Sequence, residues 1–130
     1  MRILIVEDEY VSRKFLYKFM QDYGECDVTV NGKEAIEAFI ISLEDENPYD
    51  LILLDIMMPE IDGMKVLKTI RLMERDRGII GDERVKIIMT TALNESENVM
   101  EAFDEGCEAY AAKPLDTKKL ISVMEKLNLI

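Results

Sequence analysis

The segment LILLDIMMPEIDG, residues 51–63, changes abruptly from apolar to charged. Its first four residues are aliphatic, which is typical of a strand that is covered on both faces of a parallel sheet. Asp55 follows this run directly, with no polar residue before it. Because a carboxylate at the end of a buried strand is costly unless a cation meets it, the segment indicates a functional role for Asp55.

Apolar runs of the same kind recur along the chain. Three of them resemble central strands: residues 3–6, 51–54 and 85–89. Two weaker candidates contain more polar or small residues: 26–30 and 107–112. An amphipathic segment follows each run, so strands and helices alternate five times. This alternation predicts an α/β fold with a five-stranded parallel sheet, a flavodoxin-like (βα)5 three-layer sandwich of strand order 2-1-3-4-5. We expect residues 1–130 to form a single domain.

The amphipathic segments carry start and stop signals. In the second predicted helix, Asn31 and Glu34 are spaced as a capping box, and Gly106 is a natural stop for the fourth. The connections 44–50 and 74–84 are long for simple turns. Solvated insertions are the simplest interpretation, and helix extensions or partner-specific loops are the alternatives. The first predicted helix has one apolar face, made of Val11, Phe15, Leu16, Phe19 and Met20.

The composition argues against several classes of protein. The chain carries 16 Lys and Arg against 27 Asp and Glu, and the net charge of -11 disfavours direct binding to nucleic acid or to anionic membranes. No apolar run is long enough to span a bilayer, so we expect a cytoplasmic protein. With no histidine, and with Cys26 and Cys107 expected on opposite edge strands, the sequence offers no zinc site and no internal disulfide.

Polar residues follow four of the five predicted strands. Helix caps and turns could account for most of them singly, but not for Asp55. Their coincidence at four strand ends favours a functional site. Since parallel strands direct their carboxyl ends to one edge of the sheet, we expect the following residues to meet there: Glu7, Asp8, Asp55, Thr90, Thr91 and Lys113.

The residue types at this edge are those of a phosphoryl-transfer site. Clustered carboxylates repel one another unless a cation lies among them, and Mg²⁺ prefers a few such oxygen ligands together with water. A lysine, a threonine hydroxyl and the metal can together stabilise the charge of a transferring phosphoryl group. In that setting an aspartate can act as the nucleophile and become an acyl phosphate.

Five motifs together resemble the receiver domain of two-component response regulators, specifically the single-domain kind typified by the chemotaxis response regulator. They are ILIVEDE, VNGKEA, LILLDIMMPEIDG, IIMTTA and AYAAKP, and they span essentially the whole chain. The resemblance implies a signalling switch rather than a conventional enzyme. Such a switch catalyses its own phosphorylation and dephosphorylation. The phosphodonor would be a sensor histidine kinase or a histidine phosphotransfer protein.

The resemblance also implies a role for each residue of a metal site. Asp55 matches the phosphoacceptor. Asp8 matches the acidic residue that binds Mg²⁺, and Glu7 beside it is bound directly or through a water. The backbone carbonyl of Met57 matches the third protein ligand, and we expect Mn²⁺ to be able to replace Mg²⁺.

Three positions match residues that act on the phosphoryl group or respond to it. Thr91, rather than Thr90, matches the hydroxyl residue that contacts the phosphoryl group. Lys113, before a proline, matches the lysine of the family. Tyr110 matches the aromatic residue whose rotamer is coupled to the threonine during switching.

The resemblance places the output on the face formed by the fourth helix, the fifth strand and the fifth helix. This face would contact an unidentified protein target or form a phosphorylation-dependent homodimer. The fifth predicted helix reaches the end of the sequence, so we expect no output domain in this chain. Met57 and Leu93, two residues after Asp55 and Thr91, are both apolar. We expect them to shield the acyl phosphate from water and to slow self-dephosphorylation.

Two other interpretations remain open at this point. A phosphohydrolase of the haloacid-dehalogenase kind would also use an aspartyl nucleophile and Mg²⁺. Such enzymes usually carry a second aspartate two residues later, where this chain has Met57. A degenerate receiver would act as an unphosphorylated interaction module, and the intact set of Asp8, Asp55, Thr91 and Lys113 argues against it.

Overall fold

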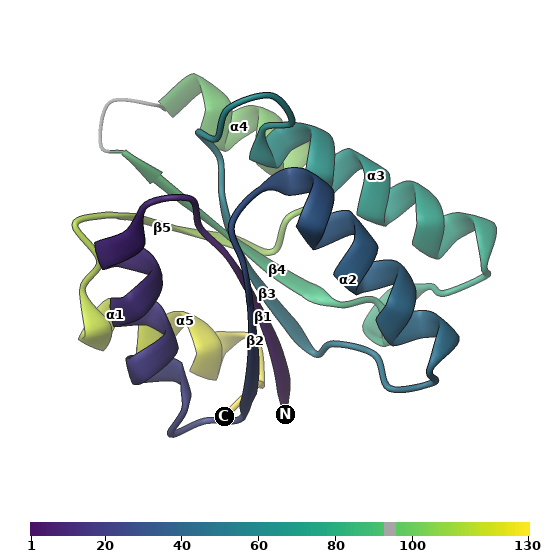
Figure 1. Ribbon diagram of the computed structural model, residues 1–130, viewed down its shortest axis with the longest axis horizontal. Coiled ribbons are helices and arrows are strands. Elements are labelled where there is room, and N and C mark those ends of the chain that lie inside the picture. Colours follow the sequence, from purple (N-terminus) through teal and green to yellow (C-terminus); the bar gives the residue numbers. More distant parts are fainter. Residues whose placement is uncertain (93–95) are drawn as a thin grey trace.

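The computed structural model describes residues 1–92 and 96–130. In that part of the chain the strands pair in parallel in the order β2-β1-β3-β4-β5, which confirms the predicted flavodoxin-like fold. Strands and helices alternate (Figure 1) as β1 (Arg2–Val6), α1 (Tyr10–Met20), β2 (Glu25–Thr29), α2 (Gly32–Glu44), β3 (Leu51–Asp55), α3 (Gly63–Asp76), the short 3-10 helix η1 (Gly81–Glu83), β4 (Lys86–Ala92), α4 (Ser96–Asp104), β5 (Ala109–Lys113) and α5 (Thr117–Lys126).

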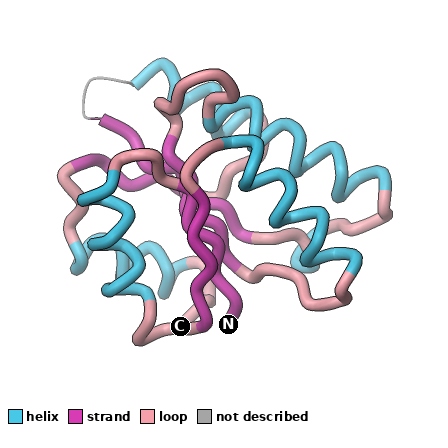
Figure 2. The backbone as a smooth tube through the Cα atoms, in the orientation of Figure 1, coloured by secondary structure: helices cyan, strands magenta, loops and turns pink. Residues whose placement is uncertain are grey.

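The sheet lies between two layers of helices. Figures 1 and 2 show α1 and α5 on one face and α2, α3 and α4 on the other. Successive residues of β3 alternate between the two cores, with Ile52 and Leu54 in the core under α2 and α3. Leu51 and Leu53 pack under α1 and α5. All four are fully buried, and each contributes about 2 kcal/mol by its removal from water, so β3 anchors the centre of the sheet.

Two helices begin at side-chain caps, the first of which the sequence indicates. The Asn31 side chain accepts a hydrogen bond from the Glu34 N–H at 2.8 Å, and the Glu34 carboxylate accepts one from the Val30 N–H at 3.0 Å. The capping box therefore forms, although its return bond reaches the residue before the cap. At α5, the Asp116 carboxylate accepts a hydrogen bond from the Lys118 N–H at 2.9 Å.

The apolar face of α1 is only partly buried. Leu16 and Met20 lie in the core, but Val11 is 70% exposed and Phe15 is 40% exposed. Helical spacing alone does not distinguish these positions. Val11 and Phe15 instead line a pocket between α1 and the connection that follows β5.

Most residues of the two long connections are exposed, as expected of solvated insertions, but each connection has a buried side chain that binds it to the sheet. After α2, the Tyr49 side chain is buried and its hydroxyl donates a hydrogen bond to Asp27 of β2 at 2.6 Å. In the second connection, α3 extends to Asp76, beyond the last apolar position of its stripe. Its buried Glu74 carboxylate accepts a hydrogen bond from the Val85 N–H at 2.8 Å. Both connections are therefore tied to the amino-terminal end of the sheet.

Two strand boundaries differ from the prediction by more than one residue. β4 continues to Ala92, past the apolar run that ends at Met89, and β5 begins at Ala109. Cys107 consequently lies in the turn before β5, and both it and Cys26 are free thiols. Among the helices of the described residues, none is both long and apolar enough to cross a membrane.

Candidate functional site

The end of β3 fixes Asp55 at the carboxyl edge of the sheet. Asp55 is the last residue of the strand, pairs in register with Thr90 of β4, and is 4% exposed. The Ile56 N–H continues the pairing by donating to the Thr90 carbonyl at 3.0 Å. The pairing with β4 therefore continues through Asp55 to Ile56, which limits the movement of the Asp55 backbone.

The loop after Asp55 closes tightly on the strand. The Met57 N–H donates to the Asp55 carboxylate at 3.2 Å, and the Gly63 N–H donates to the Ile56 carbonyl at 2.9 Å. A Cβ atom at Gly63 would lie 2.1 Å from the Asp55 carbonyl oxygen. Glycine is thus required by close backbone approach, a reason that the sequence pattern alone could not supply.

Three carboxylates meet beside this strand end. One oxygen each of Glu7, Asp8 and Asp55 lies within 4.8 Å of the others, as predicted from the strand ends. Glu7 is fully buried and its carboxylate accepts a hydrogen bond from the Glu9 N–H at 3.1 Å, whereas Asp8 is exposed. The Lys113 ammonium reaches into the cluster from β5, 2.7 Å from Glu7 and 3.3 Å from Asp55.

The electrostatics of this cluster are unbalanced. Burial raises the pKa of Asp55 to about 7, and a hydrogen bond to Glu7 and repulsion from it add to the effect, although Lys113 opposes it. Burial acts to lower the pKa of Lys113, but its contacts with Glu7 and Asp55 outweigh burial and raise the pKa. Three carboxylates and one ammonium leave two negative charges when all are ionised. This all-oxygen set fits a hard divalent cation.

The two threonines of β4 are both nearly inaccessible. Thr90 lies opposite Asp55 in β3, and Thr91 lies opposite Ala112 in β5. The Thr91 hydroxyl donates to the Ala92 carbonyl at 3.3 Å. Because side chains alternate along a strand, the two hydroxyls belong to opposite faces of the sheet. Substituting one threonine at a time would therefore test the role of each hydroxyl separately.

Tyr110 and Met57 are exposed. Tyr110 of β5 packs edge-to-face on Phe103 of α4, with 6.0 Å between ring centroids, and 46% of it is exposed. Met57 is 58% exposed beside the strand end. Leu93, the second predicted tuning position, lies outside the described residues.

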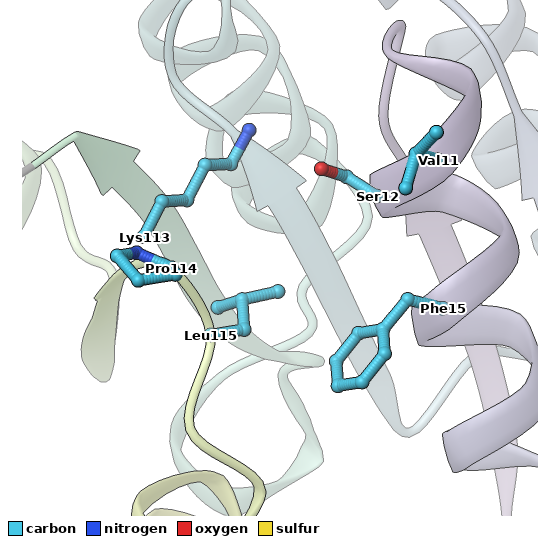
Figure 3. Close-up of a pocket in the computed structure, with 6 residues that line it drawn as sticks. All are labelled: Val11, Ser12, Phe15, Lys113, Pro114 and Leu115. Carbon is cyan, nitrogen blue, oxygen red and sulfur yellow. The ribbon is translucent and has the colours of Figure 1, made fainter.

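A pocket of about 260 Å³ adjoins the cluster between α1 and the start of the β5–α5 connection. Figure 3 shows Lys113 and Ser12 directed toward the same space from opposite walls. The exposed Val11 and Phe15 complete the α1 side, with Pro114 and Leu115 opposite. Sequence reasoning missed this pocket because it assigned the apolar residues of α1 to one continuous face.

Comparison with known proteins identifies the family. Residues 3–125 match the response regulator receiver domain, and the chain belongs to this family. It is 34% identical over 126 residues to the two-component response regulator 24 of Arabidopsis thaliana, an alignment that covers 96% of this chain and 82% of that protein. Receiver domains are signalling switches of two-component systems rather than conventional enzymes.

Two solved structures are close in fold. The receiver domain of the histidine kinase CKI1 from Arabidopsis thaliana, complexed with Mg²⁺ and BeF₃⁻, has 28% identity and a TM-score of 0.83, covering 98% of this chain and 89% of that one. The receiver domain of Ssk1, co-crystallised with the Saccharomyces cerevisiae histidine phosphotransfer protein Ypd1, belongs to a structure with 26% identity and a TM-score of 0.81, covering 96% and 87%.

The lengths of the relatives differ widely from the length of this chain. Against three curated relatives, the chain spans 7%, 55% and 82% of their own length. The first of these is a hybrid histidine kinase and the second a transcriptional regulator. The shared region is therefore the receiver domain, which recurs in proteins of different architecture.

Proposed function

We propose that this chain is a phosphoacceptor switch in which Asp55 receives a phosphoryl group in a Mg²⁺-dependent reaction. The observation that carries the proposal is the convergence of three carboxylates within 4.8 Å, with the Lys113 ammonium paired to both Glu7 and Asp55. We assign Mg²⁺ to Asp8, Asp55 and the Met57 carbonyl, with Glu7 bound directly or through a water. Mn²⁺ would take its place, because both ions accept oxygen ligands.

The donor is a phosphohistidine of a sensor kinase or phosphotransfer protein. An Asp55 carboxylate oxygen bonds to phosphorus while the phosphorus–nitrogen bond of the donor breaks. The imidazole nitrogen keeps the electron pair and takes up a proton from water. Bound Mg²⁺ supplies charge neutralisation at the phosphoryl oxygens, while Lys113 contributes a second positive charge and Thr91 a hydrogen bond. Later attack by water on phosphorus releases phosphate and restores the Asp55 carboxylate.

The surface of α1 beside the cluster suits the phosphodonor. Val11 is 70% and Phe15 40% exposed, and both line the pocket that ends at Lys113. An apolar contact there would bring a partner's histidine to the carboxyl edge of the sheet and exclude water from Asp55. The Ypd1–Ssk1 complex shows that a related receiver domain binds a histidine phosphotransfer protein.

The output face is α4–β5–α5. Met100 is 72% exposed, and it shares this face with the Phe103–Tyr110 ring pair. On phosphorylation, Thr91 would turn toward the phosphoryl group and Tyr110 would follow it inward, which changes the exposed apolar surface. The resulting contact would be with a downstream protein or with a second copy of the chain.

The lifetime of the acyl phosphate depends on access of water. Met57 is exposed beside Asp55, and we propose that it and Leu93 shield the phosphoryl group. Met57→Asn or Leu93→Glu, by offering a polar group to the attacking water, should speed dephosphorylation several-fold. Release of phosphate from the purified phosphoprotein measures this rate. Lifetimes equal to that of the wild type in both variants would contradict the shielding.

Two competing functions lack support at the site. A phosphohydrolase would need an acid two residues after Asp55, and the side chain there is the apolar Met57. An unphosphorylated interaction module would not need the paired Lys113. We further propose that residues 1–130 act as one receiver domain in the cytoplasm, without direct contact to nucleic acid or membrane, since a net charge of -11 repels both phosphate-rich surfaces.

Intact-protein mass spectrometry tests the reaction and its acceptor together. We expect one phosphoryl group on the wild type after incubation with acetyl phosphate and Mg²⁺, and none on Asp55→Asn or after prior addition of a chelator. Asp116→Asn is the matched control, because Asp116 only caps α5, and it should be phosphorylated as the wild type is. A wild type that binds the metal but gains no phosphoryl group would instead favour the interaction module.

A further inference from the structure

Arg13 links α1 to the loop that carries the acidic pair. Its side chain is half-buried, and one guanidinium nitrogen donates to the backbone carbonyls of Glu7 at 3.0 Å and Asp8 at 3.2 Å. The guanidinium therefore binds two consecutive peptide units of the loop. It does not pair with the carboxylates of Glu7 and Asp8.

The two acidic side chains differ in how they are held. The Glu7 carboxylate is buried and contacts the Glu9 N–H and the Lys113 ammonium. The Asp8 carboxylate is exposed and, among the described residues, has no hydrogen-bond partner. Its direction toward Asp55 therefore depends on the backbone from which it projects. Arg13 is the side chain that binds this backbone.

We propose that Arg13 is a positioning residue of the metal site. By binding both carbonyls it holds the Glu7–Asp8 peptide in the orientation that directs both carboxylates toward Asp55. The inference rests on the proposed metal-dependent function, and Arg13 touches neither the metal nor the phosphoryl group. It resembles the outer-shell partners of metal sites, whose removal weakens metal affinity by roughly 10–100-fold.

A simple charge effect would have the opposite sign. A guanidinium near a divalent cation repels it, so loss of the charge alone would tighten metal binding. Loss of positioning would weaken it. The direction of the change in affinity therefore separates the two roles.

Mn²⁺ binding to the full chain, followed by electron paramagnetic resonance of the free ion, measures this direction. We expect Arg13→Ala to bind Mn²⁺ about tenfold more weakly than the wild type does. Arg13→Lys, which keeps a donor in reach of one carbonyl, should recover part of that loss. The matched control is Lys14→Ala, which removes the same charge from the next residue, an exposed lysine. Its affinity should equal that of the wild type.

Hydrogen exchange in the metal-free protein provides a readout that does not need the metal. The Glu9 N–H donates to the Glu7 carboxylate, so its exchange reports on the order of this loop. Arg13→Ala should speed this exchange and Lys14→Ala should not. Unchanged exchange, or Mn²⁺ binding that is unchanged or tighter in Arg13→Ala, would overturn the proposal.

The same measurements distinguish this inference from the proposed function. A wild type that binds no Mn²⁺ would refute the proposed function, while the exchange of the Glu9 N–H would still test whether Arg13 orders the loop. If Arg13→Ala does not fold, Arg13→Gln carries both measurements, because its amide keeps one donor without the charge.

Discussion

Charged side chains are buried at both ends of the sheet, but in different arrangements. At the carboxyl end, the buried Glu7 and Asp55 share the Lys113 ammonium, and the exposed Asp8 lies beside them. At the amino end, the Arg71 guanidinium pairs with Glu74 at 2.6 Å and with both carboxylate oxygens of Glu108 at 2.8 and 2.9 Å. Buried charge is therefore common to a candidate site and to a region with no assigned reaction.

The two ends of the sheet differ in whether each charged side chain is balanced by opposite charges and hydrogen bonds. Arg71 also donates to the Gly106 carbonyl at 3.0 Å, and the remaining Glu74 oxygen accepts the Val85 N–H. Glu108 accepts the Ile87 N–H at 2.6 Å and has Arg84 3.8 Å away, so two carboxylates face two guanidiniums. This network binds α3 to the starts of β4 and β5. The carboxyl end keeps an excess of negative charge, which is what a cation site requires.

The largest expected effect on stability comes from breaking the network at the amino end. Arg71→Met should lower the free energy of unfolding by about 3–5 kcal/mol, because it leaves the Glu74 carboxylate buried without its partner. Chemical denaturation measures the loss. The folded fraction should still accept phosphate on Asp55. Lys68→Ala is the control, since its pair with Glu101 is about half exposed and should contribute less than about 1 kcal/mol.

A smaller loss of stability is expected at Gly63. Gly63→Ala places a Cβ 2.1 Å from the Asp55 carbonyl oxygen, so backbone must move at a cost of about 1–3 kcal/mol. The displacement should also slow phosphorylation by acetyl phosphate, because it moves the acceptor strand. Gly78→Ala provides the comparison: nothing lies within 4 Å of its Cβ, and only its φ of +72° opposes alanine. Equal phosphorylation rates in the two variants would show that the contact at Gly63 does not position Asp55.

Asp55→Asn should have little effect on the stability of the metal-free protein, or a favourable one. It removes a carboxylate that burial and Glu7 already disfavour in its charged form. We expect the free energy of unfolding at pH 8 to change by less than about 1 kcal/mol. Mg²⁺ should stabilise the wild type and not the variant, because Asp55 is a proposed ligand of the ion in the folded state. A large loss without metal would mean that Asp55 has a structural role like that of Glu74.

The two ends also differ in what the sequence could predict. The strands, their order and the convergence of Glu7, Asp55 and Lys113 followed from apolar runs and from the rule that parallel strands end at one edge. The network at the amino end did not. Arg71 and Glu74 have the i, i+3 spacing of an exposed helical pair, and nothing local shows that Glu108 will meet them.

Features of the site that the sequence does not predict also depend on contacts between distant segments. Arg13 was unassigned because its partners are backbone carbonyls, which leave no trace in residue type. Val11 and Phe15 have the periodicity of core residues, and only the position of α1 relative to β5 leaves them exposed. Local patterns thus specify elements and their ends, while contacts between distant segments depend on the packed structure.

The alkylation rate of Cys107 reports on the amino end of the sheet, and it is the smallest of the expected effects. Burial, with repulsion from Glu108, raises the pKa of this thiol to about 11, although Arg71 opposes the shift. Only the thiolate reacts with iodoacetamide, so at pH 8.5 Cys107 should be alkylated more slowly than the less buried Cys26. Peptide mass spectrometry gives both rates in one sample.

The effect of Arg71→Met on this rate tests whether the network orders the turn before β5. Loss of the Arg71 charge alone would raise the pKa of Cys107 further and slow its alkylation. Burial is the larger cause of the shift, so we expect local opening of the turn to dominate and alkylation to become faster. Cys26, on the far edge strand, should keep its rate. A parallel increase in the alkylation rates of both cysteines would indicate global unfolding. An unchanged rate at Cys107 would show that the backbone hydrogen bond from the Cys107 N–H to the Ala102 carbonyl, 3.0 Å long, is sufficient to hold the turn.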